Sequence, residues 1–307
     1  MNILITGGAG FLGSHLCEAL LNQGHVVIAV DNFISGDRAN VLILEKYEKF
    51  RFVEHDIIHS FEIKEPLDRV YHLACPASPV DYRDRPLETL AVSALGTWNV
   101  LKLASEKGAR FLFTSTSEIY GDPKEHPQTE NYWGNVNPIG PRSCYDEGKR
   151  FAESLVTNWG EQHKMDTRIV RIFNTYGPRM RLHDGRVITN FISQALQGKP
   201  LTVYGNGTQT RSFCYVSDMI KGLIGVMEAE KVVGPVNWGN PEERTVRVVA
   251  EIIIKLTHST STIEERPLPQ DDPTRRCPDI SKGKSVLGFE PTVSIEEGLQ
   301  KTINFLK

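Results

Sequence analysis

The amino-acid sequence predicts an α/β protein in which a doubly wound parallel sheet carries helices on both faces and a smaller lobe follows toward the C-terminus. Two observations lead to this fold class. In the first half of the chain, short apolar runs alternate with longer stretches of helical periodicity. After residue 173 this alternation weakens, the expected elements become shorter, and proline and glycine become more frequent.

The expected strands are uninterrupted apolar or β-branched runs, which are typical of parallel strands buried on both faces. They are residues 2–6, 26–30, 51–53, 69–73, 110–114 and 167–173. Helices are expected at residues 11–23, 87–107 and 145–163. The last of these has a one-sided apolar face that includes Phe151, Leu155 and Trp159, as an amphipathic helix requires.

The change of pattern after residue 173 also divides the chain into two lobes. We expect residues 1–173 and about 212–236 to form the larger lobe, and residues 174–211 and 237–307 to form a substrate-binding lobe. Residues 121–144 contain four prolines and three glycines without periodicity. Because a long irregular loop inside a compact domain is usually functional or disordered, its aromatic residues lead us to expect an ordered loop that covers a cleft.

The composition excludes several classes of protein. The 35 Lys and Arg are outnumbered by 38 Asp and Glu, and the resulting net charge of −3 argues against non-specific nucleic-acid binding. Five widely spread cysteines without CxxC spacing indicate reduced thiols in the cytoplasm rather than disulfides or a zinc site. We expect no membrane span and no signal peptide, because no segment approaches ~18 uninterrupted apolar residues and residues 2–6 already resemble a structural strand.

A glycine-rich turn joins the first expected strand to the first expected helix. Gly7, Gly10 and Gly13 permit a tight turn and a close approach of backbone N–H groups to a pyrophosphate at a helix N-terminus. Asp31 ends the second strand, where a carboxylate accepts both ribose hydroxyls of NAD and repels a 2′-phosphate. Strand, turn, helix and acid together predict a Rossmann-type NAD site, and a purely structural glycine turn is the less favoured interpretation.

Residues at the ends of neighbouring strands complete the expected cofactor site. The stretch 72–74 ends the fourth strand and Asp56 follows the third, although Asp56 alone is almost as typical of a helix cap. The predicted cofactor-binding residues are Gly7, Gly10, Phe11, Leu12, Gly13, Asp31, Asn32, Phe33, Ser35, Gly36, Asp56, Ile57, Leu73 and Ala74, together with Tyr145 and Lys149. No metal site is expected.

Tyr145 and Lys149 stand four residues apart at the start of a helix and therefore share one face. A lysine ammonium or an oxidised nicotinamide ring favours the phenolate and lowers the pKa of a tyrosine from its usual ~10. The pair is therefore suited to act as a base for a sugar hydroxyl, although this spacing alone also occurs by chance. Thr116, Ser117 and Glu118 close the fifth strand at the sheet edge where ligands bind, unless they serve only as caps and a solvated acid.

Several motifs resemble those of the extended short-chain dehydrogenase/reductase superfamily, whose members act on nucleotide sugars. They are GGAGFLGSH, DNF at residues 31–33, HLA, TSTSEIYGD, Tyr145-x-x-x-Lys149 and FNTYGPR. Within the superfamily, the chain is most similar to the UDP-glucuronate decarboxylases, also called UDP-xylose synthases. The similarity is carried by residues 72–82, 114–150, 171–180, 184–218 and 270–280.

The resemblance implies a role for each matching residue. Tyr145 would deprotonate the sugar 4-hydroxyl, Lys149 would hold the nicotinamide ribose and lower the pKa of the tyrosine, and Thr116 would hydrogen-bond the 4-oxygen. Glu118, with Ser117, would assist at the carboxylate and at C5. The residues that would bind the nucleotide sugar are Pro79, Tyr82, Asn99, Asn174, Arg179, Leu201, Tyr204, Arg211 and Arg276.

The implied reaction is NAD-dependent decarboxylation of UDP-glucuronate to UDP-xylose through a 4-keto sugar, with NAD regenerated. Ala91-Val92 stands where these decarboxylases often carry Lys-Thr, so a 4-epimerase, a 4,6-dehydratase or a 4-dehydrogenase of another nucleotide sugar remains the alternative. A non-catalytic NAD-binding regulator is less favoured, because the catalytic set is complete. The resemblance also implies a homodimer formed through the helices at 87–107 and 145–163, without a nucleic-acid or membrane partner.

Overall fold

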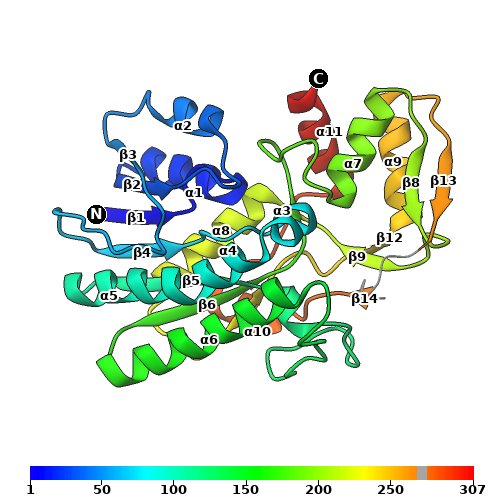
Figure 1. The fold of residues 1–307 in the computed structure, drawn as a ribbon. Coiled ribbons are helices and arrows are strands. Elements are labelled where there is room, and N and C mark those ends of the chain that lie inside the picture. Colours follow the sequence, from blue (N-terminus) through cyan, green and yellow to red (C-terminus); the bar gives the residue numbers. More distant parts are fainter. Residues whose placement is uncertain (268–274) are drawn as a thin grey trace.

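The computed structural model describes residues 1–267 and 275–307 and has the predicted doubly wound α/β fold (Figure 1). Within these ranges, seven parallel strands form the main sheet. In spatial order they are β11 (Val236–Trp238), β6 (Thr167–Ile172), β5 (Arg110–Thr116), β4 (Arg69–His72), β1 (Asn2–Thr6), β2 (Val26–Asp31) and β3 (Phe50–Glu54). The strand order reverses between β4 and β1, where a doubly wound sheet opens a crevice for ligands.

Helices cover both faces of the sheet because its strands are apolar on both faces. In β1, Ile3 and Ile5 belong to one buried core, whereas Leu4 belongs to the other. The first core is closed by α1 (Phe11–Asn22), α2 (Arg38–Leu44) and α8 (Val216–Glu228). The second is closed by α5 (Thr97–Lys107) and α6 (Ser143–His163).

The helix expected at 87–107 is divided into three parts. It consists of α4 (Pro86–Ala91), a π-helical turn η1 (Val92–Gly96) and α5. At this turn Ser93 Oγ donates a hydrogen bond to the Thr89 carbonyl at 2.8 Å, and a Cβ at Gly148 of α6 would lie only 2.9 Å from Ser93 Oγ. The irregular turn therefore lies where α6 approaches most closely, and such turns frequently occur at functional sites.

The remaining elements lie mostly beyond the carboxyl ends of the main strands, on the right of Figure 1. Among the described residues, three small sheets form there: β8 with β13, β7 with β10, and β9 between β12 and β14. These strands are β7 (Thr175–Tyr176), β8 (Leu201–Tyr204), β9 (Thr210–Ser212), β10 (Cys214–Tyr215), β12 (Glu243–Thr245), β13 (Ile263–Arg266) and β14 (Arg275–Arg276). The helices are α3 (Pro79–Asp84), α7 (Val187–Leu196), α9 (Val246–Thr257), α10 (Ser281–Leu287) and α11 (Ile295–Leu306), with a 3₁₀ turn η2 at Ser117–Tyr120.

Helix α10 departs from the expected division into lobes. It lies within 237–307, yet Gly283 packs against the indole ring of Trp238, the last residue of β11 in the main sheet. The exact lobe boundaries therefore stay a prediction. Of the stretch 270–280 that carries part of the resemblance, residues 270–274 lie outside the described residues.

The irregular stretch before α6 is held by the C-terminal part of the chain. Gln128 is completely buried, its side-chain oxygen accepts a hydrogen bond from the Cys277 N–H at 2.9 Å, and its backbone N–H donates to the Cys277 carbonyl at 2.9 Å. Tyr132 stacks on Tyr120, with ring centroids 6.0 Å apart. These contacts place the loop directly beside β14.

The described part of the chain contains no helix that is both long enough and apolar enough to cross a bilayer. All five cysteines carry free thiols.

Replacing Gly222 by alanine should destabilise the fold, because α8 meets β11 at this residue without room for a side chain. A Cβ at Gly222 would lie 1.9 Å from Nε1 of the fully buried Trp238 ring. We expect the free energy of unfolding to fall by about 1–3 kcal/mol in urea titrations. Lys221→Ala, at an exposed position on the same helix, should change it by less than about 0.5 kcal/mol. Equal effects of the two substitutions would contradict this packing argument.

Candidate active site

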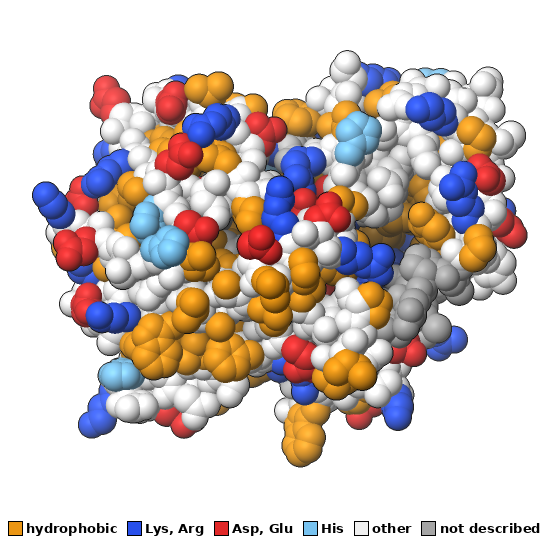
Figure 2. Space-filling view, viewed as in Figure 1, with side chains coloured by type: hydrophobic (Ala, Val, Ile, Leu, Met, Phe, Trp, Pro, Cys, Tyr) orange, Lys and Arg blue, Asp and Glu red, His pale blue; other side chains and the backbone are white. Residues whose placement is uncertain are grey.

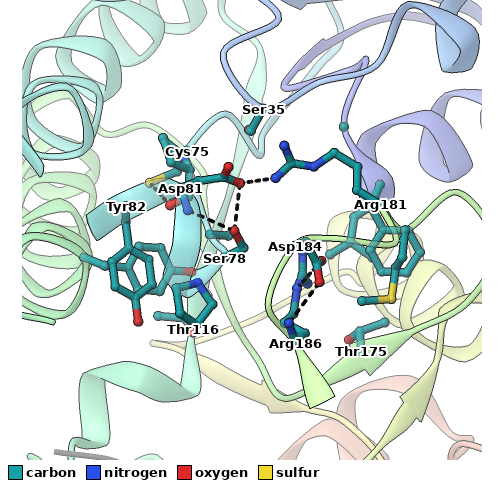
Figure 3. Close-up of a pocket in the computed structure, with 18 of the residues that line it drawn as sticks. Ser35, Cys75, Ser78, Asp81, Tyr82, Thr116, Thr175, Arg181, Asp184 and Arg186 are labelled. Carbon is teal, nitrogen blue, oxygen red and sulfur yellow. Dashed lines mark hydrogen bonds and ion pairs between the residues drawn. The ribbon is translucent and has the colours of Figure 1, made fainter. Parts of the chain in front are cut away.

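A cavity of about 720 Å³ lies at the carboxyl ends of the central strands, at the crevice that the strand order predicts. Main-sheet residues such as Gly7 and Thr116 line one side, and Tyr204 and Arg211 line the other. Figure 3 shows how Arg181 reaches across it to Asp81 of α3. The cavity is therefore bordered by both parts of the chain.

The glycine-rich turn is built so tightly that side chains are excluded. Gly7 has a positive φ of 77°, and a Cβ at Gly13 would lie 1.9 Å from the Gly7 carbonyl oxygen. Helix α1 begins after Gly10 without a side-chain cap, and its first residues line the cavity. Its N-terminal N–H groups and the positive end of the helix dipole are therefore directed to the place where a pyrophosphate would bind.

Asp31 lies at the end of β2 on the wall of the same cavity. Its Oδ2 accepts a hydrogen bond from the Ala9 N–H at 3.0 Å, and its Oδ1 accepts one from the Phe33 N–H at 2.8 Å. Burial raises the pKa of Asp31, and these two N–H donors oppose that rise. The two hydrogen bonds therefore fix the Asp31 carboxylate beside the glycine turn, on the cavity wall where the acid of a Rossmann-type site binds the adenosine ribose.

Most of the predicted cofactor residues are brought together. All of them line the cavity except Phe33 and Gly36. Gly36 still matters for the site, because a Cβ there would lie 2.9 Å from Asp31 Oδ1. Asp56 lines the cavity and also forms a local turn, since its carboxylate accepts hydrogen bonds from Asn32 Nδ2 and the Ile58 N–H. The helix-cap interpretation of Asp56 is wrong, because residues 57–59 form a turn and strand β4 is the next element of the chain, whereas its place on the cavity wall agrees with the predicted cofactor site.

The catalytic residues predicted from β5 and α6 lie side by side. The Tyr145 hydroxyl is hydrogen-bonded to Thr116, and its ring stacks on Tyr82 with centroids 5.2 Å apart. Lys149 Nζ donates a hydrogen bond to the Thr114 carbonyl at 2.8 Å and lies 6.0 Å from the centroid of the Tyr145 ring. All of these residues line the cavity.

The electrostatics of Tyr145 differ from the expectation. Burial raises the pKa of the Tyr145 hydroxyl far above its usual value, and the hydrogen bond from Thr116 offsets only part of this rise. Burial also lowers the pKa of Lys149, whose ammonium is directed to a carbonyl of β5 rather than to the phenol. Lys149 alone therefore does not lower the pKa of Tyr145 below its usual value.

Glu118 lies between two guanidinium groups. Arg276 Nη1 bonds to Oε1 of its carboxylate, and Arg142 Nη2 bonds to Oε2. Burial alone would raise the pKa of Glu118, but the two arginines hold it at about 2. Arg142 was not predicted from the sequence, because it lies in the irregular loop without any periodic relation to Glu118.

Arg211 and Arg179 also belong to the predicted substrate-binding residues, and their surroundings differ from those of Arg276. Strands β9 and β14 pair in parallel with Arg211 opposite Arg276, so both buried guanidinium groups reach the cavity from adjacent strands. Arg179 also lines the cavity, but its Nη2 is bonded to Glu18 of α1. Pro79, Tyr82, Asn174 and Tyr204 line the cavity as well.

Two predicted substrate residues do not line the cavity. Asn99 donates hydrogen bonds from its amide to the carbonyls of Ile57 and Ile58, and it therefore holds in place two residues that do line the cavity. Leu201 is completely buried in the hydrophobic core at the start of β8. Their roles in binding stay predictions, and the structure gives both a packing role.

Sequence reasoning also missed a polar group on the opposite wall of the cavity. Arg181 forms an ion pair with Asp81, which also accepts a hydrogen bond from Ser78 Oγ at 2.8 Å (Figure 3). Arg186 pairs with Asp184 at 2.7 Å in the same loop. Their sequence signal was only their position in or beside the stretches that carry the resemblance, with Asp81 inside 72–82, Arg181 beside 171–180, and Asp184 and Arg186 inside 184–218.

Comparison with known proteins identifies the family to which this fold and site belong. A family model described as the NAD dependent epimerase/dehydratase family matches residues 3–239. The chain belongs to this family. It is 53% identical over 303 residues to UDP-glucuronic acid decarboxylase 1 of Danio rerio, covering 99% of this chain and 72% of that protein. It is also 53% identical over 300 residues to UDP-glucuronic acid decarboxylase 6 of Arabidopsis thaliana, covering 97% of this chain and 87% of that protein.

Solved structures of the family confirm the Rossmann-type fold. The UDP-glucuronic acid 4-epimerase of Bacillus cereus, crystallised with UDP-glucuronic acid and NAD, superposes with a TM-score of 0.90 at 30% identity, covering 100% of this chain and 99% of that one. The UDP-glucose 4-epimerase of Thermotoga maritima, crystallised with UDP-glucose, gives 0.89 at 28% identity, covering 100% and 98%. As a member of this family, the protein is an NAD-dependent enzyme.

The residues present fit NAD. The glycine turn and the uncapped N-terminus of α1 suit its pyrophosphate, and Asp31 suits its adenosine ribose. When bound, NAD would supply a hydride acceptor beside Tyr145 and Lys149.

Asp31→Asn should weaken NAD binding, because the amide loses the charge and one of the acceptors that the ribose hydroxyls need. We expect about a 10- to 100-fold increase in the dissociation constant by isothermal titration calorimetry. Glu54, the register partner of Asp31 in β3, is an exposed acid that does not line the cavity. Glu54→Gln should therefore bind NAD as the wild type does, and an unchanged affinity of Asp31→Asn would argue against the assigned role.

Proposed function

We propose that this enzyme converts UDP-glucuronate to UDP-xylose and CO₂, with NAD regenerated in each turnover. The observation that carries the proposal is the cluster beside Tyr145 and Thr116, in which Glu118 is held by Arg142 and Arg276. A buried cluster with two guanidinium groups suits a sugar that carries a carboxylate. The identity of about half to curated UDP-glucuronic acid decarboxylases supports the same substrate.

The residues have distinct tasks in this reaction. Tyr145 removes the proton of the 4-hydroxyl while Thr116 holds the 4-oxygen, and Lys149 stays fixed on the Thr114 carbonyl to orient the cofactor ribose. Oxidation at C4 makes the sugar a β-keto acid, so the C5–C6 bond breaks and its electron pair passes into the ketone. Glu118, with Ser117, assists at the carboxylate and at C5, where the enolate takes a proton from water. Tyr145 returns its proton to the 4-oxygen when C4 is reduced again.

Arg211 and Arg276 bind the diphosphate and the sugar. Their opposite positions on the adjacent strands β9 and β14 and the burial of both side chains support this role. Tyr204 lies half-exposed on the same wall of the cavity. A 4-epimerase acting on UDP-glucuronate remains the alternative, because it uses the same C4 oxidation without loss of CO₂. Its sole product would be UDP-galacturonate.

Incubation of the purified protein with UDP-glucuronate and NAD should release CO₂ and a UDP-pentose, observed by mass spectrometry. UDP-galacturonate as the only product would favour the epimerase, and unchanged substrate would rule out the proposed reaction. Tyr145→Phe should keep NAD bound but reduce turnover by about 10²–10⁴-fold, because the proton acceptor is lost. A near-normal rate would place the base elsewhere.

We also propose that two copies associate through the outer faces of α4, α5 and α6, and that the enzyme works in the cytoplasm. Figure 2 shows hydrophobic side chains gathered over α5 and α6. The exposed apolar residues of α4, of the turn η1 between α4 and α5, of α5 and of α6 are Leu87, Leu90, Leu95, Trp98 and Phe151. A second copy would cover this patch by isologous packing of the same helices. The free cysteines support a reducing compartment.

Light scattering of the wild type should give the mass of two chains, and Leu95→Glu with Trp98→Glu should give one. The substitutions place two charges in the apolar patch, where they would be desolvated in the dimer. Leu42→Glu provides the control, because Leu42 is equally exposed but lies on α2. A wild type that is monomeric at all concentrations would refute the dimer.

A further inference from the structure

Arg142 joins Glu118 to the helix that carries the catalytic tyrosine. It precedes α6 directly, three residues before Tyr145, and its side chain is as buried as that of Glu118. The two oxygens of the Glu118 carboxylate have separate partners, with Arg142 on Oε2 and Arg276 on Oε1. Arg142 thus comes from the residue that directly precedes α6 and Arg276 from β14, two places far apart in the sequence.

We propose that Arg142 is a positioning residue that keeps Glu118 ionised and in place while the carboxylate of the substrate occupies the cavity. The inference rests on the proposed function, since it requires a substrate with a carboxylate. Its basis is the balance of charge in a buried site. The positive charges of Arg142 and Arg276 balance the negative charges of the Glu118 carboxylate and the substrate carboxylate, so the four groups together are neutral. Without Arg142, two carboxylates would share one buried cation, and one of them would be expelled or protonated.

The two arginines are not equivalent. Arg276 Nε is buried and without a hydrogen-bond partner within the described residues, and Arg276 Nη2 lies 3.5 Å from the Gly121 carbonyl, at the limit of a hydrogen bond. Arg276 therefore retains donors for a further acceptor and can turn toward a substrate. Arg142 is anchored on α6 beside Tyr145, so it is the partner that can hold Glu118 when Arg276 is engaged.

Asp146 determines how much of the charge of Arg142 is available to Glu118. Its Oδ2 lies 4.0 Å from Arg142 Nε, and its Oδ1 is buried without a partner among the described residues. Burial and the charge of Glu118 raise the pKa of Asp146 to about 7. Below this pH Asp146 is mainly neutral and no longer competes with Glu118 for the charge of Arg142. The other titratable groups around this cluster are Tyr82 from α3, Arg276 from β14, and Tyr145 and Glu147 from α6.

The test measures the ionisation of Glu118 without any turnover. The enzyme with bound NAD is labelled with ¹³C at the glutamate side-chain carboxyl carbon, which excludes Asp146 from the spectrum, and the Glu118 signal is assigned from its absence in Glu118→Gln. In the wild type this carboxyl should stay ionised from pH 4 to 8. In Arg142→Gln its midpoint should rise by about 2–3 pH units, to a value at which the signal changes within the measured range. In Arg142→Lys the midpoint of Glu118 should lie between those of the wild type and Arg142→Gln, because lysine keeps the positive charge but lacks the paired N–H donors of a guanidinium group.

Kinetics on the same proteins give the second readout. For Arg142→Gln we expect kcat/KM for UDP-glucuronate to fall by about 100-fold, with UDP affinity within about threefold of the wild type. A new acidic limb should appear in its pH profile. Arg150→Gln is the matched control, because Arg150 lies on the same helix and donates to the Ile119 and Trp133 carbonyls. It should shift neither the pH profile nor the Glu118 signal.

An unshifted Glu118 signal in Arg142→Gln would overturn the inference, whatever the rate of that variant. A shift of equal size in Arg150→Gln would also overturn it, since the effect would then reflect a loosened helix. A wild type that binds UDP-glucuronate but releases no CO₂ would refute the proposed function alone, because the carboxyl measurement does not depend on turnover.

Discussion

The contact between α6 and the end of β5 is the constraint on which the rest of the site depends. Lys149 is buried and donates to the Thr114 carbonyl, Gly148 allows α6 to approach Ser93, and further along the helix Glu153 bonds to Ser115. Three consecutive residues of β5, from Thr114 to Thr116, therefore face partners on one helix. Because buried polar groups are costly without partners, this register between helix and strand has few alternatives. It brings Tyr145 to Thr116 and places Arg142 above Glu118.

The charges of the site are balanced locally, which is why the net charge of −3 was uninformative about anionic ligands. Arg171 is paired with Glu153, and Arg179 is paired with Glu18. At the cavity, Glu118 instead faces two arginines, so that cluster keeps a surplus of positive charge whenever Asp146 is neutral. A surplus of this kind is poorly screened in a buried place and therefore selects an anionic group strongly.

Features that depend on neighbouring residues could be predicted from the sequence. The strands, the glycine turn and Asp31 each follow from the local pattern, and the structure contains them within a few residues of the predicted ranges. Features that depend on distant segments could not be predicted. The placement of Arg142 on Glu118, the pairing of Arg211 with Arg276, and the contact of Gln128 with Cys277 arise from tertiary packing. The π-helical turn at Val92–Gly96 has no signal in the apolar pattern, and the residue that packs against it, Gly148, lies far away in the sequence.

The pKa of Tyr145 illustrates the same difference between local pattern and tertiary setting. The spacing of Tyr145 and Lys149 suggested a tyrosine whose pKa is lowered by an adjacent ammonium, yet burial dominates and favours the neutral phenol.

The raised pKa of Tyr145 is an advantage in the proposed reaction. Tyr145 must give up its proton readily only while the cavity holds a positive charge near the ring, and it must hold that proton firmly afterwards so that it can return it to the 4-oxygen. A residue with a permanently low pKa would perform the first step well and the last step poorly, because a strong proton donor is needed there. The burial of Tyr145 against Tyr82, with Lys149 directed away to the Thr114 carbonyl, therefore suits a catalyst that must act once as a base and once as an acid.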